Sequence, residues 1–158
     1  MKFHEFIHSE AIVASMEGAD KESAILELID GLIAAGRLQR EDRLAIHQAI
    51  MRREELNSTA IGRGVAVPHT KHASVSGVVG TVGVCARGVD FGSPDGEPVQ
   101  LLFLLISPPD RPGDHLRALE NISRQLDKEP FRQSLLQATT AADVIRLLED
   151  ADQNPYFR

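Results

Sequence analysis

Cysteine, aromatic residues and long apolar runs are all scarce in this sequence. It has one cysteine, Cys85, no tryptophan and 4% aromatic residues among 158 positions. A lone thiol excludes an internal disulfide and a multi-cysteine metal cage, and it is typical of a reducing compartment, so we expect a cytoplasmic protein. No apolar run approaches the roughly 20 residues of a membrane-spanning helix, and the start of the chain lacks the pattern of a signal peptide. We therefore expect no membrane insertion.

Positive charge is also in deficit. Lys and Arg total 17 against 23 for Asp and Glu, so the formal net charge is -6. A nucleic-acid-binding protein normally presents a basic face to phosphates, so this total argues against that class, without excluding a local basic patch. The apolar fraction of 42% is typical of a folded chain. We predict one domain over residues 1–158, in which the polar tail from about 151 to 158 is either loose or docked on the body.

Apolar residues recur at helical spacing near both ends of the chain. The apolar stripe of the first predicted helix is strong, whereas that of the second, which includes Leu44, is weak and predicts a half-exposed helix. In the third helix, capped by Asp114, we expect Leu116 to be among the buried residues, with Leu119, Ile122 and Leu126. The predicted helices span residues 21–35, about 40–55, from Asp114 onward, 131–138 and 140–150.

The middle of the chain has strand-like patterns at residues 59–67, 75–86 and 99–106. The last of these is apolar without alternation, which is typical of a central strand covered by helices on both faces. The gaps between these segments are too short for crossover helices, so some neighbours must be antiparallel. The expected fold is α/β: a single-domain sandwich, in which a mixed parallel and antiparallel sheet of about five strands is flanked by helices on both faces.

The most distinctive segment runs from Gly62 to His69. Pro68 fixes its own φ and favours extended geometry at Val67, so we expect His69 at the mouth of a loop rather than in the core. An imidazole there is a good nucleophile near neutral pH, because an appreciable fraction is unprotonated. From the spacing alone, an ordinary loop histidine is the more common interpretation.

A second histidine pattern lies at the N-terminus, where His4-Glu5-Phe6-Ile7-His8 spells the H-E-x-x-H signature of zinc proteases. That signature needs a helix that places both imidazoles on one face, together with a third ligand. The β-like pair Ile12-Val13 follows too soon for such a helix, so we interpret the match as coincidental and expect no metal site. Cys85 lies in an apolar strand pattern and is interpreted as a small buried hydrophobic residue.

Several segments together resemble the mannitol/fructose-type EIIA domains of the bacterial phosphotransferase system (PTS). They occur in the family's order and cover nearly the whole chain, although Thr70 stands where members often have glycine. With no EIIB or membrane portion in the sequence, the chain looks most like the stand-alone nitrogen-regulatory EIIA. The matching segments are REELNSTAIG (53–62) with GVAVPH (64–69), GVDF (88–91), DGEPV (95–99), LLFLLI (101–106) with Pro108, and HLRAL (115–119) with Ile122 and Ser123.

The resemblance implies a phosphocarrier, a phosphotransferase of the phosphoenolpyruvate-dependent system that needs no metal or organic cofactor. His69 would accept a phosphoryl group, as a tele-phosphohistidine, from the phosphohistidine of the small carrier HPr or of its nitrogen-branch version. Arg53 would hold phosphoryl oxygens with its planar fork, and His115 would donate a hydrogen bond to the group. With Asp114 as cap, His115 would lie in the first helical turn, where free N–H groups also favour an anion.

Three interpretations of the role stay open. The first is a nitrogen-regulatory EIIA that signals through protein contacts, and the second is a sugar-specific EIIA that passes the group to a fructose or mannitol EIIB. The third is a regulatory binding module gated by phosphorylation, without onward transfer. The expected partners are HPr and, beyond it, sensor kinases, transporters or an EIIB domain. Ile61, Val65 and Val67 would help to form a shallow docking face for HPr.

Overall fold

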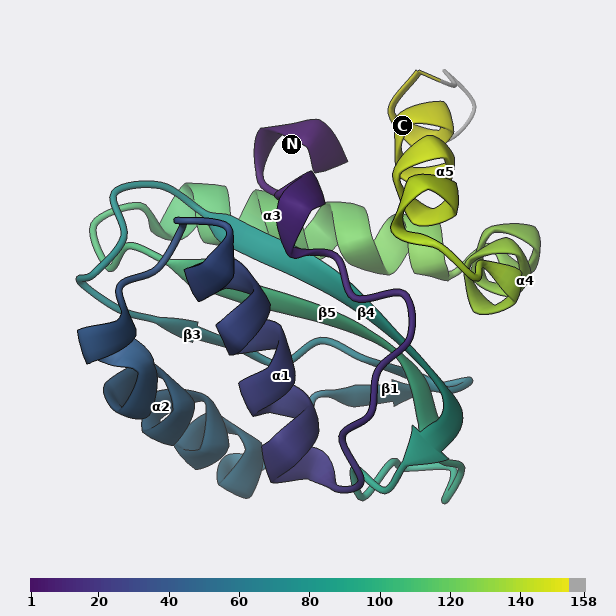
Figure 1. Cartoon of the computed structure of the whole chain (residues 1–158), viewed down its shortest axis with the longest axis horizontal. Helices are drawn as coiled ribbons and strands as arrows, with labels where there is room; N and C mark the ends of the chain where they lie inside the picture. The colour runs from purple at the N-terminus through teal and green to yellow at the C-terminus, as the bar shows by residue number, and fades with distance from the viewer. Residues whose placement is uncertain (154–158) are drawn as a thin grey trace.

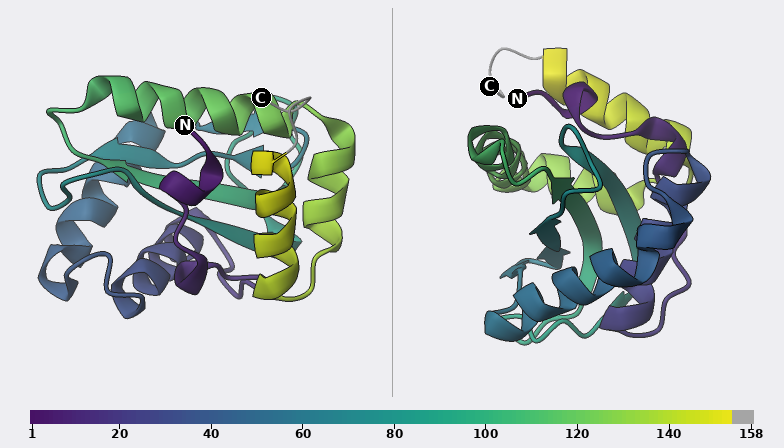
Figure 2. Two further views of the ribbon diagram at one scale, coloured as in Figure 1. Left: turned by 90° about the horizontal axis from the view of Figure 1, so that it is seen from above. Right: turned by 90° about the vertical axis from the view of Figure 1, so that its left-hand side faces the viewer.

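A mixed sheet lies between two layers of helices in the computed structural model, which describes residues 1–153 (Figures 1 and 2). The strands are β1 (Ala60–Gly62), β2 (Val65–Ala66), β3 (His69–Lys71), β4 (Val79–Val89) and β5 (Val99–Ser107). The helices are α1 (Lys21–Ala34), α2 (Arg43–Leu56), α3 (Pro112–Leu126), α4 (Glu129–Gln137) and α5 (Ala141–Gln153), with short 3-10 helices at Phe3–Glu5, Ser9–Ala11 and Arg40–Asp42.

The apolar residues form two clusters, one on each face of the sheet. The first cluster joins one face to α3, α4, α5 and the N-terminal turn, and the second joins the other face to α1 and α2. Figure 2 shows the sheet between these layers. The α/β sandwich with a mixed five-stranded sheet confirms the predicted fold class. None of the helices within residues 1–153 has the length and apolar character that crossing a membrane requires.

Strand β5 is the centre of the sheet, as its unbroken apolar run predicts. It pairs in parallel with β2 and β3 on one side and antiparallel with β4 on the other. All of its residues except Gln100 are buried. Because both faces of a central strand are covered by helices, no polar face is needed and the alternation disappears.

Strands β2 and β3 are two parts of one interrupted strand beside β5. Val65 pairs with Leu101 and His69 with Leu105, so the register offset is the same in both parts. The interruption falls at Pro68, which has no N–H to donate, although its carbonyl still accepts a hydrogen bond of 3.0 Å from Leu105. The strand-like segment 59–67 is therefore a hairpin, β1–β2, leading into this strand.

The N-terminal segment covers the outer edge of β4. Ile7 and Val13 form parallel bridges with Gly80 and Gly83 of that strand. The segment is tied to α5 by Asp152, whose carboxylate accepts the main-chain N–H groups of the first 3-10 helix at 2.8 and 2.9 Å. Residues 151–153 of the predicted tail thus belong to α5, and the remainder, residues 154–158, lies outside the described residues.

Two helices differ in their buried faces from the prediction. In α2 the buried apolar side chains are Ile46 and Ile50, whereas Leu44 is 65% exposed. In α3 Leu116 is 57% exposed. The face of α3 that packs on the sheet instead begins at His115 and continues through Ala118 and Ile122. The prediction was wrong at Leu116 because it ranked residues by hydrophobicity, whereas His115 is the residue of this turn that is buried.

Candidate functional site

His69 is the first residue of β3 and is half-buried. The prediction of a loop position was wrong, because the strand resumes directly after Pro68. Side chains alternate along a strand, so His69 shares the α3 face with Val65 and Val67. Its Nδ1 lies 2.7 Å from the Val67 carbonyl oxygen. A carbonyl only accepts hydrogen bonds, so the neutral ring carries its proton on Nδ1 and leaves a lone pair on Nε2.

His115 faces His69 from α3. The two ring centroids are 5.4 Å apart, with an interplanar angle of 53°. His115 is buried, and its Nδ1 lies 2.6 Å from the hydroxyl oxygen of Ser107 at the end of β5. The parallel pairing of β3 with β5, followed by the short connection to α3, brings the two imidazoles together.

The prediction that Asp114 caps this helix was wrong. Pro112 is the first residue of α3, and the fixed φ of proline suits that position. The carboxylate of Asp114 instead pairs with Arg111 and Arg117. The N–H of His115 already donates to the carbonyl of Arg111 at 3.2 Å, so it is not free for an anion.

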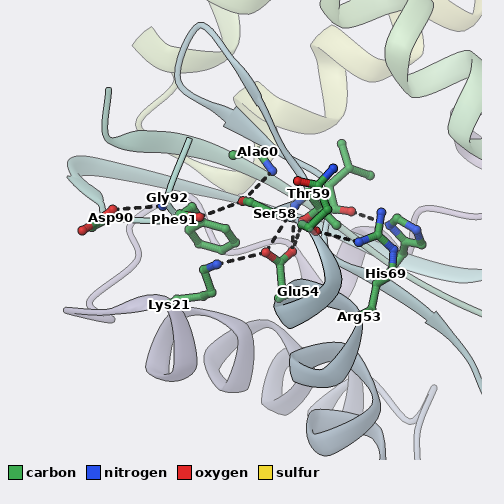
Figure 3. A network of polar contacts seen from close by, with 12 residues as sticks. Lys21, Arg53, Glu54, Ser58, Thr59, Ala60, His69, Asp90, Phe91 and Gly92 are labelled. Atoms are coloured by element: carbon green, nitrogen blue, oxygen red, sulfur yellow. Dashed lines mark hydrogen bonds and ion pairs between the residues drawn. The ribbon is translucent and has the colours of Figure 1, made fainter. Parts of the chain in front are cut away.

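Arg53 approaches His69 from the opposite layer, near the C-terminal end of α2 (Figure 3). Its Nη1 donates to the carbonyl oxygen of Asn57 at 2.7 Å, which holds the guanidinium at the helix end. Helix α2 packs beside β3, so the arginine reaches the same pocket as the imidazole. Cations are favourable near a helix C-terminus, and this contact therefore costs little.

Next to Arg53, the buried Glu54 organises the turn between α2 and β1, and sequence reasoning assigned it no role. Its carboxylate accepts hydrogen bonds from the N–H and the hydroxyl of Thr59 and pairs with Lys21 Nζ at 3.0 Å (Figure 3). Only 5% of Glu54 is exposed. A buried carboxylate is stable only when it is paired and hydrogen-bonded, so these contacts fix the turn and the end of α2. The one sequence feature that could have indicated this role is the pair of consecutive acidic residues that follows Arg53.

The three predicted site residues line one shallow pocket together with Thr70 and Lys71. A second pocket adjoins it and shares Arg53 and His69 with it. This second pocket lies between the β1–β2 hairpin and α3. The adjoining pocket is also lined by Ser58, Thr59, Ile61, Val67, Leu119 and Ser123.

Burial and neighbouring cations keep both imidazoles neutral. Burial lowers the pKa of His69; its hydrogen bond to the Val67 carbonyl opposes that shift, while Arg53 reinforces it. Burial also lowers the pKa of His115, to about 4, with smaller contributions from His69 and Lys71. At neutral pH the pocket is therefore lined by two neutral rings, the Arg53 guanidinium and the Lys71 ammonium, and the two cations favour a bound anion.

The other residues singled out in the sequence lie elsewhere. The H-E-x-x-H segment does not form one helix, because a 3-10 helix ends at Glu5 and Ile7 then pairs with Gly80. His4 instead pairs with Asp152 at 3.2 Å. Within residues 1–153 no group of three or more His, Cys, Asp or Glu side chains is placed to hold a metal ion. Cys85 is buried in β4, as predicted.

Comparison with known families defines the class of protein. Residues 5–151 match the family described as "Phosphoenolpyruvate-dependent sugar phosphotransferase system, EIIA 2". The chain therefore belongs to this EIIA family, whose members are phosphotransfer proteins, and the resemblance found in the sequence is confirmed.

Relatives come from two branches of the family. The chain is 36% identical over 153 residues to the fructose-specific EIIABC component of Bacillus subtilis, covering 97% of this chain and 24% of that protein. It is 32% identical over 148 residues to a nitrogen regulatory protein of Bradyrhizobium diazoefficiens, covering 94% of this chain and 95% of that protein. Among solved structures, the nitrogen regulatory protein IIA-Ntr of Neisseria meningitidis matches with a TM-score of 0.81 and 31% identity, over 91% of this chain and 97% of that one.

Proposed function

We propose that this protein is a cytoplasmic phosphocarrier that accepts a phosphoryl group on Nε2 of His69. The observation that carries the proposal is the hydrogen bond between His69 Nδ1 and the Val67 carbonyl. It leaves Nε2 as the nucleophilic nitrogen of a half-buried, neutral imidazole in a pocket that also contains two cationic side chains.

The transfer needs no movement of a proton on His69. The P–N bond of a donor phosphohistidine breaks, and its electron pair stays with the donor nitrogen. The lone pair of His69 Nε2 forms the new P–N bond, while Nδ1 keeps its hydrogen and its contact with Val67. Such a transfer depends on positioning and on charge stabilisation rather than on covalent help from the protein.

Arg53, His115 and Lys71 are suited to hold the transferred group. The guanidinium and the ammonium offset the negative charge of the phosphoryl oxygens. The buried, neutral imidazole of His115 adds a hydrogen bond to a phosphoryl oxygen. Because all three line the pocket of His69, the group would be held without a metal ion.

We propose an apolar docking surface near the pocket that differs from the expected one in its residues. Val65 and Val67 are buried at 1% and 6% exposure and serve the core. Exposed apolar side chains include Leu56 at the end of α2, Ile61 on the hairpin and Leu116 on α3. Ile61 lines the pocket beside the site, and Leu56 and Leu116 lie on the helices that carry Arg53 and His115. We propose that these three side chains contact HPr or its nitrogen-branch version.

Our first proposal is that the phosphorylated protein has a nitrogen-regulatory role, because this chain matches a nitrogen regulatory protein along almost the whole length of that relative. Signalling would then pass through protein contacts, with sensor kinases or transporters as the class of partner. A sugar-specific role, with transfer to a fructose or mannitol EIIB, is the second candidate, favoured by the match to a fructose-specific EIIABC component.

Reconstituted phosphorylation tests the proposal. Purified protein is incubated with phosphoenolpyruvate, enzyme I and either HPr or nitrogen-branch HPr, and the intact mass is measured. We expect the mass to increase by one phosphoryl group, and His69→Ala to abolish the increase. The control is His72→Ala, which removes an imidazole three residues away that contacts Ser74 rather than the pocket. An unmodified wild-type chain with every donor would refute the phosphocarrier role.

The same phosphorylated protein separates the candidate roles. Rapid loss of the label to a purified fructose or mannitol EIIB supports the sugar-specific role. A label that stays on His69 in the presence of EIIB, while binding of a kinase or transporter changes with phosphorylation, supports the regulatory role. In the second case, absence of any onward transfer identifies a binding module gated by phosphorylation.

A further inference from the structure

Ser107 contacts His115 and the end of the strand that begins with His69, although neither the sequence patterns nor the family resemblance singled it out. It is the last residue of β5 and is 0% exposed. Its hydroxyl oxygen lies 2.6 Å from Nδ1 of His115. Its carbonyl accepts the N–H of His72 at 2.9 Å, directly after the strand that begins with His69. Ser107 is therefore placed to act on the chemistry of the pocket without lining it.

The hydrogen of the Ser107 hydroxyl has one acceptor within reach in the described part of the chain. Within residues 1–153, His115 Nδ1 is the one hydrogen-bond partner found for the Ser107 hydroxyl. If Nδ1 carried the ring proton, it would donate to the hydroxyl oxygen, and the hydroxyl hydrogen would be left without an acceptor in a fully buried position. A buried donor without a partner is disfavoured. We infer that Ser107 donates to Nδ1 and fixes His115 in the tautomer that carries its proton on Nε2.

The two imidazoles then have opposite tautomers. A carbonyl holds His69 with its proton on Nδ1, and a hydroxyl holds His115 with its proton on Nε2. One ring offers a lone pair to the pocket, and the other offers a donor. The functional part of this inference depends on the proposed phosphocarrier role: the Nε2–H of His115 donates to a phosphoryl oxygen on His69. The other tautomer would turn a lone pair toward that anion. Ser107 is thus a positioning residue for His115.

The tautomers can be measured directly on the unphosphorylated protein. Long-range ¹H–¹⁵N spectra at pH 7.5 distinguish the protonated from the unprotonated nitrogen of each histidine ring. We expect Nε2–H for His115 and Nδ1–H for His69 in the wild type. In Ser107→Ala we expect the Nε2–H preference of His115 to fall by about tenfold, while His69 stays unchanged. Ser107→Thr keeps the hydroxyl and is expected to restore the preference.

Thr81→Val is the matched control. It removes another fully buried hydroxyl from the same sheet, one that donates to the carbonyl of Ala11 at 2.8 Å and touches neither histidine. We expect both tautomers to be unchanged in this variant. A wild-type His115 with its proton on Nδ1 would overturn the inference, whether or not the variants fold. An unchanged His115 tautomer in folded Ser107→Ala would overturn it as well.

Phosphorylation of the same variants gives the functional consequence. We expect Ser107→Ala to lose phosphoryl groups from His69 to water about tenfold faster than the wild type, and Thr81→Val to lose them at the wild-type rate. Equal rates in Ser107→Ala would show that the tautomer does not matter for the phosphoryl group. A wild-type chain that takes up no phosphoryl group contradicts the proposed function alone, because the tautomer measurement needs no phosphorylation.

Discussion

Burial of His115 makes the stability of this protein depend on pH in a defined direction. The folded state lowers the pKa of His115 to about 4, whereas an imidazole in the unfolded chain titrates near 6.5. As pH falls below about 6.5, the unfolded state takes up a proton that the folded state does not accept, and stability is lost. The loss levels off near pH 4, where the folded imidazole is also protonated.

The size of this stability loss is set by the pKa values of His115 in the folded and unfolded states. At pH 4.5 the unfolded imidazole is almost fully protonated and the folded one only about a quarter protonated, so the linked loss is roughly 2.5 kcal/mol relative to pH 7.5. The residue is 8% exposed, but its imidazole lines the open pocket, so solvent screening makes this value an upper bound. A loss of this size is a substantial part of the stability of an ordinary domain.

Urea unfolding of the wild type and of His115→Gln at pH 7.5 and 4.5 isolates the part of the stability loss that comes from His115. Glutamine can still accept a hydrogen bond from the Ser107 hydroxyl but does not titrate. We expect the wild type to lose roughly 2.5 kcal/mol more than the variant between these pH values. The other titrating groups are shared, so their effects cancel in the comparison, with the exception of His69, which contributes to the low pKa of His115. Equal losses in the two proteins would refute the assignment of a depressed pKa to His115.

The buried polar contacts and one close-packed glycine give three further tests. Glu54→Gln removes the charge that faces Lys21, and we expect a loss of about 3 kcal/mol in urea unfolding; a loss below about 1 kcal/mol, typical of an exposed pair, contradicts this. Asp152→Ala should speed amide hydrogen exchange in the first 3-10 helix selectively, and unchanged protection argues against the tie. Gly83→Ala places a Cβ against the side chains of Met16 and of Leu28 in α1 and should lower stability by about 1–3 kcal/mol. Gly77→Ala, whose Cβ meets open space, should leave stability unchanged.

The elements that could be predicted from sequence are those whose pattern is set by burial alone. The run of β5 is apolar because both of its faces are covered, and α1 has a strong stripe because one face packs on the sheet. Helix α2 was harder, since its buried face includes Glu54, whose partners come from α1 and from the turn before β1. A charged residue on a buried face breaks the apolar period, and only the tertiary contacts explain its position.

The candidate site was predicted by family resemblance more than by physical pattern. His69, Arg53 and His115 come from three separate segments, and no local period joins them. Proline at position 68 hid the continuity of β2 and β3, because a residue without an N–H normally ends a strand. Ser107 gave no signal at all, since the partner of a buried hydroxyl is decided by the packing of α3 on β5.

The geometry of the site depends on the order in which the segments join β5. Parallel pairing at a constant register places His69 opposite Leu105, so the imidazole lies two residues before the end of the central strand. The chain then needs only residues 108–111 to begin α3, which returns His115 over that end. Arg53 arrives from the other layer and is held by the turn that Glu54 fixes. Residues from both helical layers therefore come together near the C-terminal end of the central strand. His69 is only weakly distinctive in the sequence, and the topology of the sheet places Arg53 and His115 beside it.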